Sequence, residues 1–260
     1  MSVPVLVEHR SAVTWITINR PDRRNAINAE VVGAISNGIR AAQASPNSRA
    51  IVLTGAGDTA FCAGGDLTAN AKGVPFTVDH ANPRNFVADL FRLVQDCDLP
   101  IVGRINGHAL AGGVGLLCAC DLAVAVDDAS FGVPETKIGL FPMTILPLMM
   151  RVLPQRRLME LCITGDPITA QEALAIGLVN YVVPREELDD KLTWLLDKIV
   201  ARSPTAIRLG KMAFHTMQDM PIREALDYAQ LMLPLMAETE DAREGLRAFQ
   251  EKRKPQWTGR

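Results

Sequence analysis

The segment from residue 104 to 142 constrains the fold more than any other part of the chain. An apolar run at 100–105 predicts a strand, and a glycine-rich turn, a helix of small residues at about 111–120 and a second strand at 122–126 follow it. This order of strand, helix and strand predicts a mixed α/β fold.

The turn Ala111-Gly112-Gly113 opens the predicted helix. Backbone amides at a helix start point outward and carry partial positive charge, so these residues can donate hydrogen bonds to an anionic oxygen. Glycine also lets a ligand come close to the backbone. Alternatively, the glycines only allow the helix to pack tightly on its strand. This turn alone does not decide between the two interpretations.

A second glycine-bearing turn has the sequence AFCAGGDL, at residues 60–67, and follows the apolar strand predicted at 50–53. Two such turns, each directly after a strand, can aim one amide apiece at a single carbonyl oxygen. That geometry is an oxyanion hole, which stabilises negative charge on the oxygen during reaction. The pair of turns therefore indicates acyl chemistry more strongly than either turn alone.

The segments FCAGGDL and INGHALAGGVGLLCACDLAVA, followed by FGVPETKIGLFP, resemble the crotonase, or enoyl-CoA hydratase/isomerase, superfamily. The resemblance extends from VTWITINRPDRRNAIN through GDPITAQEALAIGLVNYVVP to the helical C-terminus. It implies an α/β fold with a crotonase-like β-β-α superhelical core at 1–184 and a C-terminal helical trimerisation region at 185–260. It also implies an acyl-CoA thioester substrate, no cofactor besides the coenzyme A of that substrate, and a homotrimer or dimer of trimers.

The resemblance assigns roles to individual residues. Gly65 and Gly112 would present the two oxyanion-hole amides, and Glu135 would be the acid/base group. Glu135 has apolar neighbours, which can raise the pKa of a carboxyl group towards its working pH. Without the resemblance, an ordinary turn glutamate would be the better interpretation. The residues implied to contact substrate are Arg24, whose charge suits the nucleotide phosphates, Ala26, Ala63, Asp66, Leu67, Gly113 and Pro134.

Gly115 departs from the pattern of the family's hydratases. These enzymes carry two glutamates, and the earlier one aligns with Gly115, twenty positions before Glu135. Hydration needs a positioned water and a proton for the α carbon, a task that two carboxylates divide. Moving a double bond from the 3,4 to the 2,3 position needs one base, which takes a proton from C2 and returns it at C4. The chain thus resembles the family's Δ3,Δ2-enoyl-CoA isomerases.

Two alternatives stay open. One is a 2-enoyl-CoA hydratase, a lyase, with a non-standard group that activates water. The other is an acyl-CoA-binding subunit without turnover. Further candidate groups are weaker: Asp66 suits a local backbone cap, His108 a structural role, and Cys62 and Cys118 have no adjacent base in the sequence to activate them as nucleophiles.

Composition limits the partners and the compartment. A formal net charge of −2 gives no reason to expect nucleic acid or an anionic membrane as a partner. No leader-like segment and no apolar run of about 18 residues is present, which favours the cytoplasm. Five cysteines, without CxxC spacing, favour reduced thiols over disulfides or a metal site.

Other elements are predicted from periodicity and caps. Residues 143–150 are dense in apolar side chains, which is typical of a buried helix interrupted at Pro147 or of a wall that binds the acyl group. Residues 68–83 predict a long loop. The remaining predictions are strands at 3–9, 12–19 and 178–183; a helix from Asn28 to Ala44; a helix at 85–97; a capped helix from Thr169 to about Gly177; and helices from 186 onward with breaks at 203–204 and 220–221.

Overall fold

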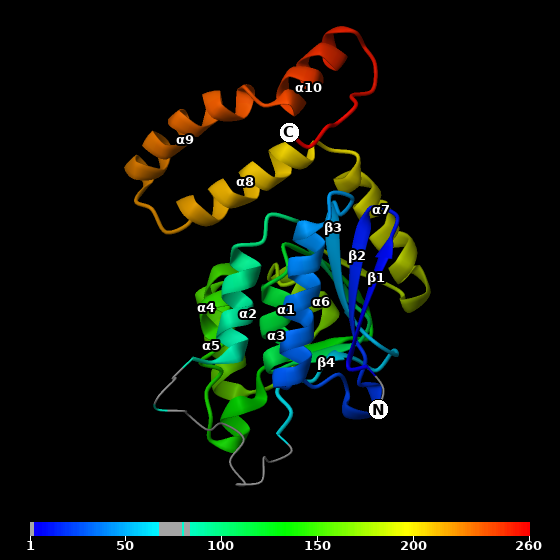
Figure 1. The fold of residues 1–260 in the computed structure, drawn as a ribbon. Helices are drawn as coiled ribbons and strands as arrows, with labels where there is room; N and C mark the ends of the chain where they lie inside the picture. The colour runs from blue at the N-terminus through cyan, green and yellow to red at the C-terminus, as the bar shows by residue number, and fades with distance from the viewer. Residues whose placement is uncertain (1–2, 68–79, 81–83) are drawn as a thin grey trace.

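The computed structural model describes residues 3–67, 80 and 84–260, and within them a large sheet and the helices that pack on it share one hydrophobic core (Figure 1). Apart from His80, the predicted loop at 68–83 lies outside the described residues. The strand order of the large sheet is β1-β2-β3-β5-β7-β10. Its strands are β1 (Val5–Arg10), β2 (Val13–Ile18), β3 (Ala50–Gly55), β5 (Ile101–Ile105), β7 (Leu122–Val126) and β10 (Tyr181–Val183).

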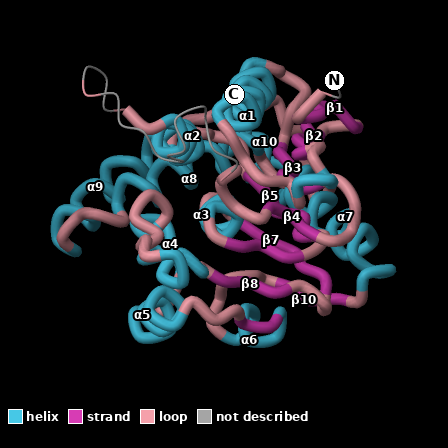
Figure 2. Tube along the Cα trace, turned by 90° about the horizontal axis from the view of Figure 1, so that it is seen from below, coloured by secondary structure: helices cyan, strands magenta, loops and turns pink. Residues whose placement is uncertain are grey.

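All neighbouring strands of this sheet are parallel except β1 and β2, which form an antiparallel hairpin. Strand β3 is buried along its whole length, as expected for a continuous apolar run inside a parallel sheet. Helix α3 lies on one side of β5 and β7, and α7 lies on the other (Figure 2). The mixed α/β prediction is confirmed.

A second, smaller sheet was not predicted from the sequence. It contains β4 (Ala60–Cys62), β6 (His108–Leu110) and β8 (Ser130–Gly132) in parallel, with β9 (Ile168–Thr169) antiparallel to β8. Strands of two or three residues are too short to show a period of two in the sequence. Residues 60–62, predicted as part of a turn, therefore form a strand.

The helices include several whose start or end was predicted from capping residues. Asn28 Oδ1 accepts from Val31 N at 2.9 Å, and Thr169 forms a complete capping box with Glu172. The helices are α1 (Ala29–Ala44), α2 (Phe86–Gln95), α3 (Gly112–Cys118), α4 (Leu146–Val152), α5 (Gln155–Thr164), α6 (Ala170–Ala175), α7 (Leu188–Val200), α8 (Pro204–Met217), α9 (Ile222–Ala237) and α10 (Glu240–Gln250), with short 3-10 turns η1 (Pro21–Arg23), η2 (Pro134–Ile138) and η3 (Arg185–Glu187).

Three predicted elements differ from the structure. Pro147 does not interrupt a helix: it lies in the first turn of α4, where its missing N–H is not needed. Strand β10 and helix α3 are shorter than predicted. The breaks at 203–204 and 220–221 are confirmed, since α8 begins at Pro204 and α9 follows Pro221.

No described helix is both long and apolar enough to cross a membrane.

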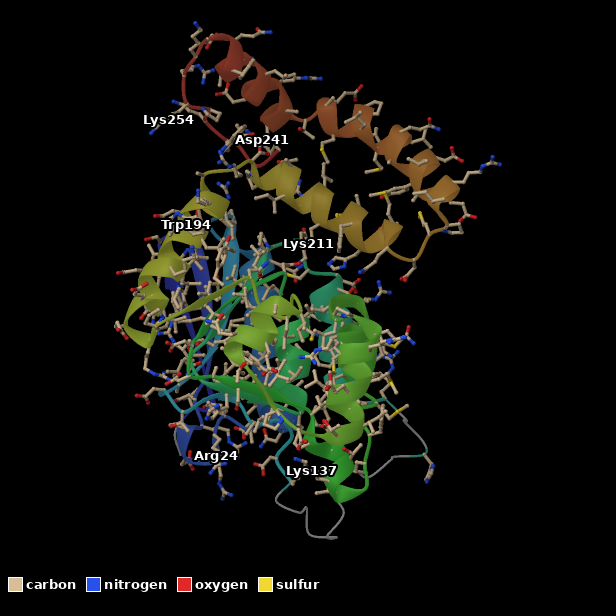
Figure 3. All side chains as sticks on the ribbon, turned by 180° about the vertical axis from the view of Figure 1, so that it is seen from behind. Arg24, Lys137, Trp194, Lys211, Asp241 and Lys254 are labelled. Carbon is tan, nitrogen blue, oxygen red and sulfur yellow. The ribbon has the colours of Figure 1, made fainter. Side chains whose placement is uncertain are left out.

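The C-terminal helices divide into one that joins the core and three that extend from it. Helix α7 buries four leucines in the core. Helices α8, α9 and α10 form an arm above the sheets (Figure 1). Lys211 on α8 ties this arm to the body, because its Nζ donates to Asp121 Oδ2 at 2.6 Å and to Leu99 O at 2.9 Å (Figure 3).

Asp241, at the start of α10, holds the end of the chain against α8. Only 1% of Asp241 is exposed. Its carboxylate accepts from Ser203 Oγ at 2.8 Å, from Thr258 N at 2.7 Å and from Gly259 N at 3.1 Å. Burial raises its pKa, and these hydrogen bonds lower it further than burial raises it, so its pKa lies below the ordinary value of 3.8.

We expect Asp241→Asn to destabilise the folded protein at neutral pH by about 3 kcal/mol, because buried hydrogen bonds to a charged group are lost. Because the pKa of Asp241 is lower in the folded than in the unfolded protein, its ionised carboxylate stabilises the fold at pH values above the unfolded-state pKa. This stability is lost as the pH falls through the folded-state pKa. The difference between Asp241→Asn and the unmodified protein in urea unfolding should therefore shrink below about pH 4. The exposed Glu238→Gln is the control. Equal stability of Asp241→Asn and the control at pH 7 would contradict this assignment.

Candidate active site

Three neighbouring strands of the small sheet deliver the three predicted catalytic residues to one edge. The chain reaches Gly65 after β4, Gly112 after β6 and Glu135 after β8. Because these strands are parallel, their carboxyl ends meet at the same edge, where ligands bind in many α/β proteins. Ala111 N donates to Gly132 O at 2.8 Å, which connects the second turn to the third.

The two glycine turns are in direct contact. A methyl group added to Gly64 would lie 2.6 Å from Ala111 Cβ and 3.0 Å from Gly112 N, and one added to Gly112 would lie 3.6 Å from Gly65 N. Gly64 also has a φ of +92°, so no other residue fits there without strain. Among the described residues, neither Gly65 N nor Gly112 N has a hydrogen-bond acceptor. Within this part of the chain, both amides therefore remain available to a ligand.

Ala111 adopts a backbone conformation that only glycine adopts readily, with φ 51° and ψ −123°. Such a residue stores strain of about 1–3 kcal/mol, which the surrounding structure must overcome. Here the Ala111 amide is held by Gly132, and its carbonyl accepts from Val114 N at 2.9 Å. Since the ψ of Ala111 helps to set the plane of the next peptide, the strained residue aims the N–H of Gly112.

The loop with Arg24 and Ala26 pairs with the first glycine turn. Ala63 N donates to Arg24 O at 3.0 Å, Ile27 N to Gly64 O at 2.8 Å, and Asp66 N to Ile27 O at 2.8 Å. The structure therefore brings the predicted substrate-binding residues of both segments together. The side chain of Arg24 is exposed at the surface of this loop (Figure 3).

Arg20 is a residue of this region whose role sequence reasoning missed. The Nη2 atom of Arg20 donates to Asp66 Oδ2 at 2.7 Å, and its Nη1 donates to Ala26 O at 2.6 Å. Both partners of the ion pair are largely buried, with 19% and 12% of their side chains exposed. A separation of 46 residues left no local signal of this pair. Arg20 fixes the loop to the first turn.

Glu135 has a buried, unpartnered carboxylate oxygen. It lies in η2, behind Pro134, and among the described residues its Oε2 has no hydrogen-bond partner. Burial raises the pKa of Glu135 above its ordinary value of 4.5, and its own backbone amide offsets this in part. A buried carboxylate oxygen without a hydrogen-bond donor is costly unless a ligand or a water donates to it. Glu135 therefore has the properties of a group that exchanges protons with a bound molecule.

The other candidates have structural explanations. Burial raises the pKa of Cys62 and of Cys118 to about 12, so both are protonated at neutral pH and are not nucleophiles. His108 is exposed at the start of β6, away from the site edge, and its Nδ1 accepts from Ser130 N at 3.1 Å. All five cysteines are free.

Gly113 and Gly115 of α3 pack against other parts of the core, and Leu67 lies at the surface. A side chain on Gly113 would overlap Cys62 O, so tight packing explains this glycine. A side chain at Gly115 would point at Ile145 and Phe91. Leu67 is half exposed at the end of the first turn.

A family model, individual relatives and a solved structure were each compared with this chain, and all three match it over nearly its whole length. Residues 8–260 match the family model described as enoyl-CoA hydratase/isomerase. The chain is 34% identical to the (E)-benzylidenesuccinyl-CoA hydratase of Thauera aromatica, with 99% of this chain and 100% of that protein covered. It is 35% identical to the carnitinyl-CoA dehydratase of Escherichia coli K12, with both chains covered completely. The crystal structure of an enoyl-CoA hydratase from Bacillus anthracis is similar with a TM-score of 0.89 and 32% identity, covering 99% of this chain and 100% of that one.

Proposed function

Because the chain belongs to the enoyl-CoA hydratase/isomerase family, we propose that it moves the double bond of a 3-enoyl-CoA thioester to the 2,3 position. In this proposal Glu135 is the acid/base group, and the amides of Gly65 and Gly112 form the oxyanion hole. Of the two positions at which the family's hydratases carry glutamate, this chain keeps only Glu135. The buried, unpartnered Oε2 of Glu135 is the observation that carries the proposal.

The reaction follows from these groups in two steps. The carboxylate of Glu135 takes a proton from C2, and the electron pair of that C–H bond moves into the thioester carbonyl to give a conjugated enolate. The amides of Gly65 and Gly112 stabilise the negative oxygen, each by roughly 3–4 kcal/mol. Protonated Glu135 then delivers the proton to C4, and the double bond is left between C2 and C3. The raised pKa of Glu135 makes its carboxylate a stronger base, which favours removal of the proton from C2 in the first step.

The proposal is tested by assaying one preparation on a 3-enoyl-CoA and on the 2-enoyl-CoA of the same chain length. Isomerisation should be faster than hydration. Hydration that equals or exceeds isomerisation under the same conditions would overturn the isomerase assignment and leave the family membership intact. Binding of both esters without turnover of either would favour an acyl-CoA-binding subunit.

Hydration is the second candidate, because relatives of this chain are named for it. The Thauera aromatica relative is named a hydratase, and the Escherichia coli relative is named a dehydratase. A 2-enoyl-CoA hydratase with Gly115 would need a group other than a carboxylate at that position to activate water. The same pair of assays separates this candidate from the isomerase.

We also propose that the protein assembles into a trimer or a dimer of trimers. Helix α9 has no buried residue, and several of its exposed side chains are apolar. An unpartnered apolar surface of this kind is typical of an interface between copies. Light scattering at micromolar concentration is expected to give three or six times the 28.2 kDa mass of one chain. A monomer would contradict this prediction. The exposed leucines of α9 are Leu226, Leu231, Leu233 and Leu235.

A further inference from the structure

Gly115 lies one helical turn after Gly112, on the helix that begins at the oxyanion turn. Residues three positions apart share one face of a helix, so a side chain at 115 would leave α3 close to the proposed Gly112 donor. This is also the position at which the family's hydratases carry their first glutamate. The space beside Gly115 therefore bears on which reaction the site performs.

That space is filled by other side chains. A methyl group added to Gly115 would overlap Ile145 Cγ2, and it would lie 2.8 Å from Ile145 Cβ and 3.1 Å from Phe91 Cζ. A Cβ atom does not lie closer than about 3 Å to a non-bonded heavy atom, so Ile145 would have to move. Even alanine does not fit at position 115 beside the present Ile145.

Ile145 has little freedom to move aside. It is 4% exposed, and its carbonyl accepts from Leu148 N and Met149 N, both at 3.1 Å, at the start of α4. Phe91 on α2, which is 5% exposed, closes the same space from another element. Three elements, α2, α3 and α4, therefore meet at this point without room for a further carbon atom at position 115.

We infer that Ile145, together with Gly115, determines reaction specificity. The side chain of Ile145 occupies the volume that a water-activating side chain at position 115 of α3 would need. This inference rests on the proposed function. The side chains of Ile145 and Phe91 are apolar, so neither can form a hydrogen bond to hold a water for attack on the double bond. A carboxylate at position 115 therefore requires two changes, because glutamate fits only after Ile145 is made smaller.

The packing part of the inference is tested by a stability cycle, which does not depend on catalysis. Gly115→Ala should lower the melting temperature through overlap, and Ile145→Ala should lower it by leaving a cavity. The double variant should be at least as stable as Gly115→Ala alone, since the new methyl enters the vacated space. Additive losses would overturn the inference. Gly33→Ala is the matched control, because Gly33 is also in a helix but has nothing within 4 Å of an added methyl, and this change should not destabilise.

The functional part uses Gly115→Glu, Ile145→Ala and their combination, each assayed with a 2-enoyl-CoA and a 3-enoyl-CoA. We expect the combination to hydrate the 2-enoyl-CoA at least tenfold faster than either single variant. Equal hydration by Gly115→Glu alone would overturn the role of Ile145. No gain in a folded double variant that still binds the ester would also overturn it. The proposed function fails separately, if the unmodified enzyme does not isomerise the 3-enoyl-CoA.

Discussion

Glu135→Gln is expected to abolish isomerisation of a 3-enoyl-CoA while leaving the affinity for the CoA ester nearly unchanged. The amide has the shape of the carboxylate but cannot accept a proton from C2. Loss of a general acid–base group costs roughly 10²–10⁴ in rate, and no second carboxylate occupies the other family position, Gly115. The measurements are kcat by product analysis and Kd by calorimetry with a non-reactive acyl-CoA.

Glu186→Gln is the control for this experiment, because Glu186 is an exposed glutamate on η3. It should retain full activity. The role of Glu135 would be refuted if its glutamine variant turned over at the rate of the control. A variant that lost binding and turnover together would instead indicate that Glu135 supports the shape of the site.

Gly112→Pro is expected to reduce kcat by roughly 10²–10³ because proline removes one oxyanion-hole donor. Gly112 is the first residue of α3, where helices accept proline without losing an internal hydrogen bond. The effect should fall on kcat more than on KM, since the amide stabilises charge that develops during the reaction. Circular dichroism and thermal unfolding would establish that the variant is folded.

Gly112→Ala separates the loss of the donor from the change of side chain. It keeps the N–H, and its methyl would lie 3.5 Å from Gly64 Cα and from Ile27 Cδ1, which are ordinary contact distances. We therefore expect this variant to retain most of the activity. A folded Gly112→Pro protein with the activity of Gly112→Ala would show that the Gly112 amide does not stabilise the reacting oxygen.

The parts of the fold that the sequence predicted well carry their signal locally. Helix α1 has an asparagine cap and a regular apolar stripe, and α6 has a complete capping box, so neither depends on distant residues to be recognised. The two glycine turns were also found, since glycine pairs directly after apolar strands are conspicuous. The structure brings the two turns into contact at Gly64 and Ala111, and the convergence of their amides on one oxygen stays a prediction.

The features that were missed arise from contacts between distant parts of the chain. The ion pair of Arg20 with Asp66 and the contact of Gly115 with Ile145 join residues whose local patterns say nothing about each other. The strands of the small sheet are individually too short for a periodic signal, and they form because their neighbours provide the hydrogen bonds. Pro147 has a local explanation instead: it lies in the first turn of α4, where proline is tolerated, and so it starts a helix instead of interrupting one.

The pairing between the loop at 24–27 and the first glycine turn has a consequence for how binding energy is used. The two segments share three backbone hydrogen bonds and the clamp of Arg20, so their relative position is set during folding. Preorganisation of this kind reduces the conformational entropy that the protein must lose when a ligand binds. If the loop binds the nucleotide end of coenzyme A, contacts far from the thioester also align its carbonyl with Gly65. A small thioester that lacks the nucleotide would therefore lose reactivity along with affinity.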